Sequence, residues 1–164
     1  MSHVVAITGA AGGIGAALAH CYAREGARLV LLDLDGEAVE RLAEVLVGAG
    51  VEVLSMPCDV TGLDACNAAV AKIEVQFGRL DVLVNNAGIT HFGAFEQTDI
   101  EVLRRVMDVN LFGSINMTQA ALALLLASRG QIIAISSVYR SCPLPLRAAS
   151  WPSQPLSRWS LATQ

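Results

Sequence analysis

The chain has 164 residues, of which 54% are hydrophobic and 16% charged, and its formal net charge at pH 7 is −4. This length and composition predict a compact domain with a sizeable core and argue against a disordered chain. A mild acidic charge without basic clusters argues against nucleic acid and anionic membrane surfaces as partners.

The N-terminal residues show no signal-peptide pattern, and the most apolar helical run is too short to cross a bilayer. The four cysteines have spacings that match no zinc or redox motif. We therefore expect reduced thiols, no metal site, no membrane partner and a cytoplasmic protein.

Segments with the patterns of strands and helices alternate along the chain. Strands are predicted over residues 3–8, 29–33, 51–56, 80–85 and 129–137. Helices are predicted over residues 14–27, 36–50 and 63–78 and, as two helices, over roughly 99–127. The strands are almost continuous runs of Val, Ile and Leu, which is typical of strands buried on both faces. This alternation predicts a doubly wound α/β fold with a parallel sheet through residue 137.

The first predicted strand runs into TGAAGGIG, residues 8–15, and then directly into a helix. Glycines let a backbone turn tightly and approach a pyrophosphate, and the N-terminus of the following helix offers N–H donors and partial positive charge. The spacing of Gly9, Gly13 and Gly15 departs from the commoner G-x-G-x-x-G, and a simple tight turn is the alternative interpretation. We predict a dinucleotide-binding loop.

Asp33 ends the second predicted strand, eighteen residues after Gly15. A carboxylate near this position accepts hydrogen bonds from an adenosine ribose and repels a 2′-phosphate. Arg28 precedes that strand rather than following it, so no clamp for a 2′-phosphate competes. The alternative interpretation is a solvated acid at a strand end. We predict NAD as the cofactor and NADP as the less favoured one.

Five motifs in order identify a family resemblance over residues 1 to about 139. They are TGAAGGIG, the CDV at residues 58–60, the NNAG at 85–88, the MDVN at 107–110 and the ISS at 135–137. Together they resemble the short-chain dehydrogenase/reductase family. The resemblance implies a Rossmann-like, NAD-binding domain over residues 1–139 that belongs to an oxidoreductase. Its substrates would be small alcohols or carbonyl compounds, and such proteins are usually homo-oligomeric.

The resemblance also implies roles for individual residues. The residues that it assigns to cofactor binding are Gly9, Gly13, Ile14 and Gly15 for the pyrophosphate, Asp33 for the ribose, Asp59 and Val60 for adenine, and Asn86, Ala87 and Gly88 for the wall of the cleft. Asn85 would steady the central strand. Asn110 would help to hold a proton-relay water, and Ser137 would bind the substrate oxygen. Without the resemblance, Asn110 could simply kink or cap a helix and Ser137 could end a strand. His91 lies in a nearby loop, where a histidine is more often merely solvated.

The family's chemistry also needs a Tyr-x-x-x-Lys pair about thirteen residues after the serine, and here Ser150 and Gln154 stand at those positions. Lys72 is the only lysine in the sequence, and the residue four after Tyr139 is a proline. A general acid–base group contributes about 10²–10⁴ in rate. We therefore expect this chain to have low or no activity.

Residues 140–164 differ in composition from the preceding part of the chain. They contain four of the five prolines and both tryptophans, but no glycine, lysine or acidic residue. We expect an irregular tail, with the C-terminal part of the family fold missing and the fifth strand left as an edge. The tail is either a divergent C-terminus or the product of a shifted reading frame after about residue 139, and the abrupt change favours the second. Three hypotheses follow: an NAD-dependent oxidoreductase lineage whose chain is altered, a non-catalytic dinucleotide-binding module, or a chain too incomplete to fold stably.

Overall fold

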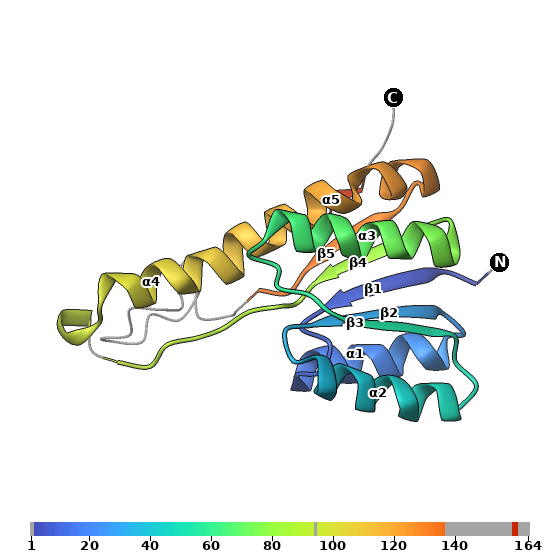
Figure 1. The fold of residues 1–164 in the computed structure, drawn as a ribbon, viewed down its shortest axis with the longest axis horizontal. Helices are drawn as coiled ribbons and strands as arrows, with labels where there is room; N and C mark the ends of the chain where they lie inside the picture. Colours follow the sequence, from blue (N-terminus) through green and yellow to red (C-terminus); the bar gives the residue numbers. More distant parts are fainter. Residues whose placement is uncertain (1, 94, 137–158, 161–164) are drawn as a thin grey trace.

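A parallel sheet of five strands lies at the centre of the molecule (Figure 1). The computed structural model describes residues 2–93, 95–136 and 159–160. The parallel strands are β1 (Val4–Thr8), β2 (Arg28–Asp33), β3 (Val53–Pro57), β4 (Val82–Asn85) and β5 (Gln131–Ala134). Their order in the sheet is β3-β2-β1-β4-β5. The predicted doubly wound, Rossmann-like sheet is therefore confirmed.

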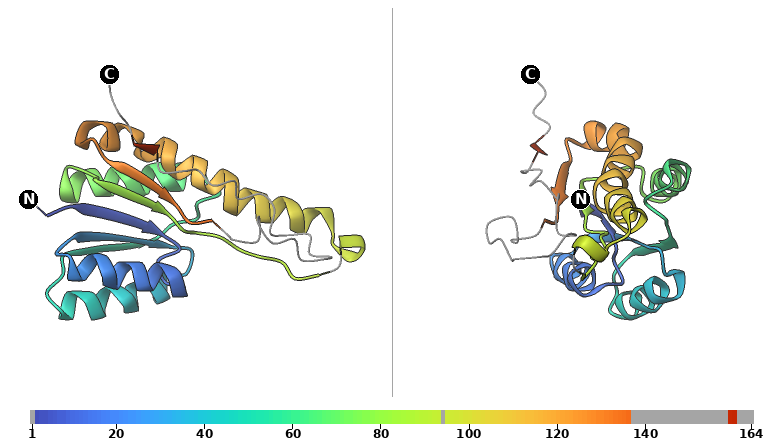
Figure 2. Two further views of the ribbon diagram at one scale, coloured as in Figure 1. Left: turned by 180° about the vertical axis from the view of Figure 1, so that it is seen from behind. Right: turned by 90° about the vertical axis from the view of Figure 1, so that its left-hand side faces the viewer.

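Helices cover both faces of this sheet. One face carries α1 (Gly13–Arg24) and α2 (Gly36–Gly48), and the other carries α3 (Leu63–Phe77) and α5 (Gly113–Ser128) (Figures 1 and 2). Successive residues of β1 alternate between the two cores: Val4 and Ala6 belong to the core under α3 and α5, whereas Val5 and Ile7 belong to the core under α1 and α2. This double burial explains why the strand sequences are continuously apolar.

The structure replaces the two helices predicted near residues 99–127 with one continuous helix, Ile100–Ser128. A short 3₁₀-helix, Phe95–Gln97, precedes it. Within it, a π-turn over Asp108–Phe112 joins α4 (Ile100–Met107) to α5 without a break. Because the helix is continuous, it is long and apolar enough to cross a membrane by length and composition, contrary to the expectation from its apolar run alone. Such a helix is weak support for membrane insertion, because a buried core helix passes the same test. Met117, Ala121 and Leu125 are fully buried in the protein core.

The carboxyl ends of the parallel strands meet at one edge of the sheet. The strand order reverses between β1 and β4, which is where ligands bind in open α/β sheets. At the outer side, Trp159–Ser160 forms the short strand β6, antiparallel to β5, so that β5 is not the open edge that the sequence predicted. Ser137, Tyr139, Ser150 and Gln154 lie outside the described residues.

Candidate functional site

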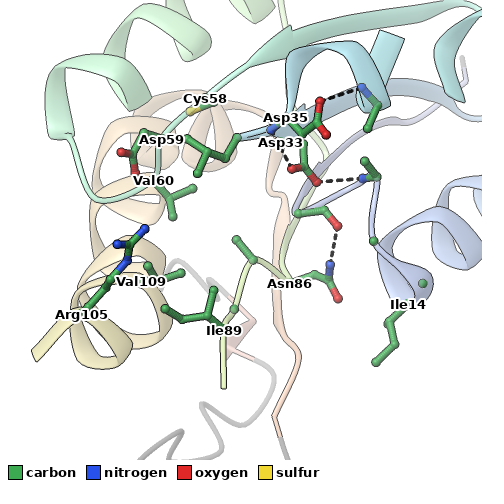
Figure 3. A pocket seen from close by; sticks show the side chains of 18 residues that line it. Ile14, Asp33, Asp35, Cys58, Asp59, Val60, Asn86, Ile89, Arg105 and Val109 are labelled. Carbon is green, nitrogen blue, oxygen red and sulfur yellow. Dashed lines mark hydrogen bonds between the residues drawn. The ribbon is translucent and has the colours of Figure 1, made fainter. Parts of the chain in front are cut away.

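A cavity of about 750 Å³ opens at the carboxyl edge of the sheet (Figure 3). Its walls come from the loops that follow β1, β2, β3 and β4, and from the helix that begins at Ile100. The sequence-predicted residues that line it are Gly9, Gly13, Ile14, Asp33, Asp59, Val60, Asn86, Ala87 and Gly88. The lining also contains residues that had no individual role predicted from the sequence: Ala11, Gly12, Cys58 and Val109 lie within the quoted motifs, and Leu34, Asp35, Ala38, Ile89 and Arg105 lie outside them.

The glycine loop is closely packed on its own backbone and on the loop after β4. Gly9 has a φ of +62°, and a Cβ atom there would lie 2.8 Å from the Cα of Ala87. A Cβ atom on Gly15 would lie 2.2 Å from the carbonyl oxygen of Gly9. Gly15 is buried and does not line the cavity, whereas a Cβ atom on Gly13 would meet nothing within 4 Å. Gly15 therefore shapes the loop, and Gly13 leaves the space in front of the helix open.

The N-terminus of α1 faces this open space without a side-chain cap. Gly12 is its N-cap residue, and its first turn contains no acidic side chain. The first N–H groups of a helix have no partners within the helix and carry the positive end of its dipole. This arrangement suits a phosphate group, so the residues present fit a dinucleotide at this site.

Asp33 is tied to the glycine loop by a backbone hydrogen bond. The N–H of Ala11 donates to Asp33 Oδ2 at 2.9 Å, and the N–H of Asp35 donates to Oδ1 at 3.1 Å. Each carboxylate oxygen keeps further acceptor capacity, because an ionised carboxylate has about four lone-pair sites. The carboxylate of Asp35 instead caps α2, because its Oδ1 accepts a hydrogen bond from the N–H of Ala38 at 3.0 Å. Asp33 is therefore the carboxylate that is held beside the glycine loop.

The loop after β3 forms another wall of the cavity. Asp59 Oδ1 accepts from both the N–H and the hydroxyl of Thr61, at 2.9 and 2.8 Å. The side chain of Asn116 in α5 donates to the carbonyl oxygens of Val60 and Thr61 at 3.0 and 3.1 Å. Gly113 permits this approach, because a Cβ atom there would lie 2.6 Å from Val60 Cγ2. Helix α5 thus fixes Asp59 and Val60 in place.

Two buried cysteines belong to this wall: Cys58, which lines the cavity, and Cys66 in α3. Cys66 Sγ donates to the carbonyl oxygen of Val60 at 3.7 Å. A hydrogen bond with Cys66 lowers the pKa of Cys58 against the opposing effect of burial, and the same bond together with burial raises the pKa of Cys66. Cys66 is therefore held as a neutral thiol in the core.

The ends of β1 and β4 are joined by side-chain hydrogen bonds. Thr8 Oγ1 accepts from the N–H groups of Asn86 and Ala87, both at 3.0 Å. Asn86 Nδ2 donates to the carbonyl oxygens of Thr8 and Gly9 at 3.0 and 2.9 Å. Asn85 extends the connection to α5, because its Nδ2 donates to Thr118 Oγ1 at 3.0 Å. The predicted wall of the cleft is thus rigidly attached to the glycine loop.

Of the two predicted catalytic residues, the structure describes only Asn110, and it does not line the cavity. Asn110 lies in the π-turn, and its side-chain amide bonds the backbone of Ile89. Ser137 lies outside the described residues. His91 does not line the cavity, and its Nε2 lies 3.3 Å from Thr98 Oγ1.

Comparison with known proteins gives a consistent result. The family model described as short chain dehydrogenase matches residues 3–149. The chain is 40% identical to the bovine (Bos taurus) protein dehydrogenase/reductase SDR family member 7B, over 89% of this chain and 47% of that protein. It spans about half the length of the curated relatives it matches.

Two solved structures have the same fold at similar levels of identity. One is an alcohol dehydrogenase from Thermococcus sibiricus complexed with 5-hydroxy-NADP, with a TM-score of 0.85 and 31% identity over 90% of this chain and 63% of that chain. The other is an NAD⁺-bound xylitol dehydrogenase, with a TM-score of 0.85 and 32% identity over 90% of this chain and 58% of that chain.

Proposed function

The chain belongs to the short-chain dehydrogenase family, and on this premise we propose that its cavity binds NAD(H). We further propose that the chain derives from an oxidoreductase that transfers a hydride between the nicotinamide and a secondary alcohol or ketone. The observation that carries it is the hydrogen bond from Ala11 to Asp33, which holds a ribose-binding carboxylate beside the uncapped N-terminus of α1. The complexes of similar proteins with NAD⁺ and with an NADP derivative support a nicotinamide dinucleotide.

Asp33 favours NAD over NADP in this proposal. A carboxylate at the end of β2 accepts hydrogen bonds from the ribose hydroxyls, whereas a 2′-phosphate there would meet like charge. Arg28 begins β2 and therefore lies at the opposite edge of the sheet. Its guanidinium carbon lies 5.2 Å from the ring centroid of Phe77, and Arg28 does not line the cavity, so its charge is not available to a 2′-phosphate there.

In this proposal, different residues in and around the cavity contact different parts of the dinucleotide and the substrate. Backbone N–H groups at the start of α1, near Gly13 and Ile14, would hold the pyrophosphate, with Gly9 and Gly15 shaping the loop behind them. Asp59 and Val60 would contact the adenine, and Asn86, Ala87 and Gly88 would form the inner wall. Asn110 would position that wall through Ile89, and Ser137 would donate to the substrate oxygen. The bound nicotinamide would supply or accept the hydride.

We propose low or no turnover for this chain, because the acid–base group of the family's chemistry is absent from it. A phenol has an unperturbed pKa of about 10 and needs a nearby ammonium to act as a base at neutral pH. Ser150 and Gln154 offer neither group, and Lys72, the only lysine, lies in α3. The same observation favours a second candidate function, a non-catalytic dinucleotide-binding module.

Calorimetric titration with NAD and NADP, followed by NADH absorbance assays with a panel of secondary alcohols and ketones, tests the proposal. Tight NAD binding with little or no turnover is the expected result. Substrate-dependent NADH formation at the rates of ordinary dehydrogenases would contradict the inactivity. Failure to bind either dinucleotide would overturn the proposed function, and the absence of a cooperative melting transition would indicate a chain too incomplete to fold.

Sequencing the encoding DNA through codon 139 separates the two accounts of the tail. If a shift of one base restores a tyrosine and a lysine at positions 150 and 154, the tail is an accident of frame. A confirmed frame would leave the binding module as the function of the chain.

A further inference from the structure

Cys58 and Cys66 are two free thiols in contact at the wall of the cavity. Both are buried in the core under α3 and α5, and their side chains share a hydrogen bond. Contact between the two side chains is the arrangement that a disulfide requires. Cys58 also lines the cavity, and Figure 3 shows its sulfur on the cavity wall above Val60. One thiol of the pair can therefore be reached from the cavity, and the other lies against it in the core.

The two cysteines also hold the chain segment that lies between them. The N–H of Cys58 donates to the carbonyl oxygen of Asp33 at 2.8 Å, and Cys66 Sγ lies 3.7 Å from the carbonyl oxygen of Val60. Because a thiol carries a single proton, Cys66 donates it either to Val60 or to Cys58. Oxidation of both thiols would remove both S–H donors from this wall. The oxidation state of the pair is therefore coupled to Asp33 and Val60, which line the cavity.

The surroundings of the two thiols give them different reactivities. The thiolate is the nucleophile in thiol chemistry. The hydrogen bond from Cys66 lowers the pKa of Cys58, and the same bond raises the pKa of Cys66. Cysteines that respond to oxidants typically combine a low pKa and access to solvent with a neighbouring thiol that resolves the first product. Cys58 faces the cavity, so a ligand bound there would shield it.

We propose that Cys58 and Cys66 form a reversible disulfide that weakens dinucleotide binding in the cavity. Hydrogen peroxide, as the simplest hydroperoxide, is the oxidant. The Cys58 sulfur attacks one peroxide oxygen, the O–O bond breaks, and the Cys58 proton leaves with the other oxygen as water, which gives a sulfenic acid. The Cys66 sulfur then attacks the Cys58 sulfur, the S–O bond breaks, and the Cys66 proton leaves with the hydroxyl group as a second water. The effect on binding rests on the proposed function, whereas the disulfide itself does not.

Peroxide treatment of the reduced full chain tests the disulfide. The remaining thiols are alkylated, and the digested chain is analysed by mass spectrometry. The expected product is a pair of peptides linked through Cys58 and Cys66, which dithiothreitol separates. C58A should leave Cys66 as a free thiol. C21S is the matched control, because Cys21 is exposed in α1 and does not line the cavity, and it should form the same disulfide at the same rate.

Calorimetric titration of the reduced and the oxidised chain with NAD tests the effect on binding. The oxidised chain should bind NAD about tenfold more weakly, which is a typical size for coupling between two sites. Dithiothreitol should restore the affinity of the reduced chain. Saturating NAD should in turn slow the formation of the disulfide by about tenfold, because binding and oxidation oppose each other. Peroxide treatment of C58A should leave its NAD affinity unchanged.

The outcomes separate this inference from the proposed function. Thiols that stay unlinked at Cys58 and Cys66, or a disulfide that joins other cysteines, would overturn the redox pair and leave the proposed function intact. Equal NAD affinities of the reduced and oxidised chains would overturn the coupling alone. Loss of the cooperative melting transition on oxidation would also overturn it, because the disulfide would then unfold the chain rather than regulate the cavity. No NAD binding by the reduced chain would overturn the proposed function, and peptide mapping would still decide whether the disulfide forms.

Discussion

The side-chain amide of Asn110 forms two hydrogen bonds with the backbone of Ile89. The N–H of Ile89 donates to Asn110 Oδ1 at 2.8 Å, and Asn110 Nδ2 donates to the Ile89 carbonyl oxygen at 2.9 Å. These bonds join the π-turn of the long helix to the loop that follows β4. π-Turns inside helices are frequent at functional sites. Asn110 itself does not line the cavity, but through these bonds it positions Ile89, which does.

Asn110→Ala should loosen this wall. Each lost hydrogen bond at a partly exposed site contributes about 0.5–1.5 kcal/mol, so the loss of two should lower the free energy of unfolding by about 1–3 kcal/mol. NAD affinity should fall several-fold, because Ile89 and Gly88 lose their support. Denaturant unfolding and calorimetric titration measure the two effects. Ser114→Ala is the control, since Ser114 bonds only the Asn110 carbonyl oxygen within its own helix, and it should change neither quantity by much.

Asn110→Asp gives a sharper version of the same test. The carboxylate keeps an acceptor for the Ile89 N–H but places its other oxygen against the Ile89 carbonyl oxygen. Protonation removes this repulsion and restores a donor, so the pKa of the introduced acid should be raised in the folded state. Its stability relative to the unmodified chain should therefore improve as the pH falls toward 4. A pH-independent difference would mean that the two hydrogen bonds do not govern the loop.

Gly15→Ala should disrupt the glycine loop, whereas Gly13→Ala should leave it folded. The added methyl at position 15 would lie 2.2 Å from the Gly9 carbonyl oxygen and 2.8 Å from the Cα of Ala10, both backbone atoms that cannot move aside. Overpacking typically costs about 1–3 kcal/mol, and a loss of at least this size is expected. At position 13 nothing lies within 4 Å, so the melting temperature should be unchanged. Equal melting temperatures of the two variants would contradict this account of the loop.

The sequence predicts those parts of the site that are encoded locally. The first strand was expected over residues 3–8 and is Val4–Thr8, and the glycines lie between it and α1 as expected. Asp33 could be placed near them because parallel strands end at a common edge. Gly15 was expected to wrap the pyrophosphate, and the structure instead gives it a packing role inside the loop. The functional roles of these residues stay predictions.

Other parts of the site depend on tertiary structure and could not be derived in this way. Arg105 lies outside the five motifs, and Val109 lies within MDVN but had no role assigned to it; both reach the cavity because the long helix passes the carboxyl edge of the sheet. The continuity of that helix depends on a π-turn, which has no simple periodic signal. Strand β6 depends on pairing with β5, and its two residues carry no strand pattern of their own.

Asp33→Asn should reduce the preference for NAD over NADP. The unmodified carboxylate should disfavour a 2′-phosphate, and a neutral amide removes that repulsion and one acceptor for the ribose. The ratio of the two dissociation constants should change by about tenfold, the effect of about 1.4 kcal/mol. Asp35→Asn is the matched control, because Asn caps a helix as well as Asp does and the residue lines the same cavity. Tighter binding of NADP than NAD by the unmodified chain would contradict the role of Asp33.

Asp81→Asn should destabilise the protein at neutral pH but much less in acid. Asp81 lies at the opposite edge of the sheet, with only 7% of its side chain exposed. Burial alone would raise the pKa of its carboxyl, but hydrogen bonds from Arg79 and from the N–H of Val4, with the charge of Arg79, lower it below the usual range. The Val4 bond is 2.8 Å long and joins the start of β1 to this carboxylate. Losing the charged partner should cost about 1.5–3 kcal/mol at pH 7.

The pH dependence follows from the lowered pKa of Asp81. Its stabilisation is fully present above the unfolded-state pKa of about 3.9 and is lost as the pH falls through the lower folded-state value. The gap between the unmodified chain and Asp81→Asn should therefore be constant from pH 7 to about pH 5 and close below about pH 4. Arg41→Ala is the control, because its ion pair with Glu37 has side chains 66% and 91% exposed and should contribute little at any pH. Urea unfolding at several pH values measures both variants, and a gap that persists at low pH would show that Asp81 acts through packing rather than through its charge.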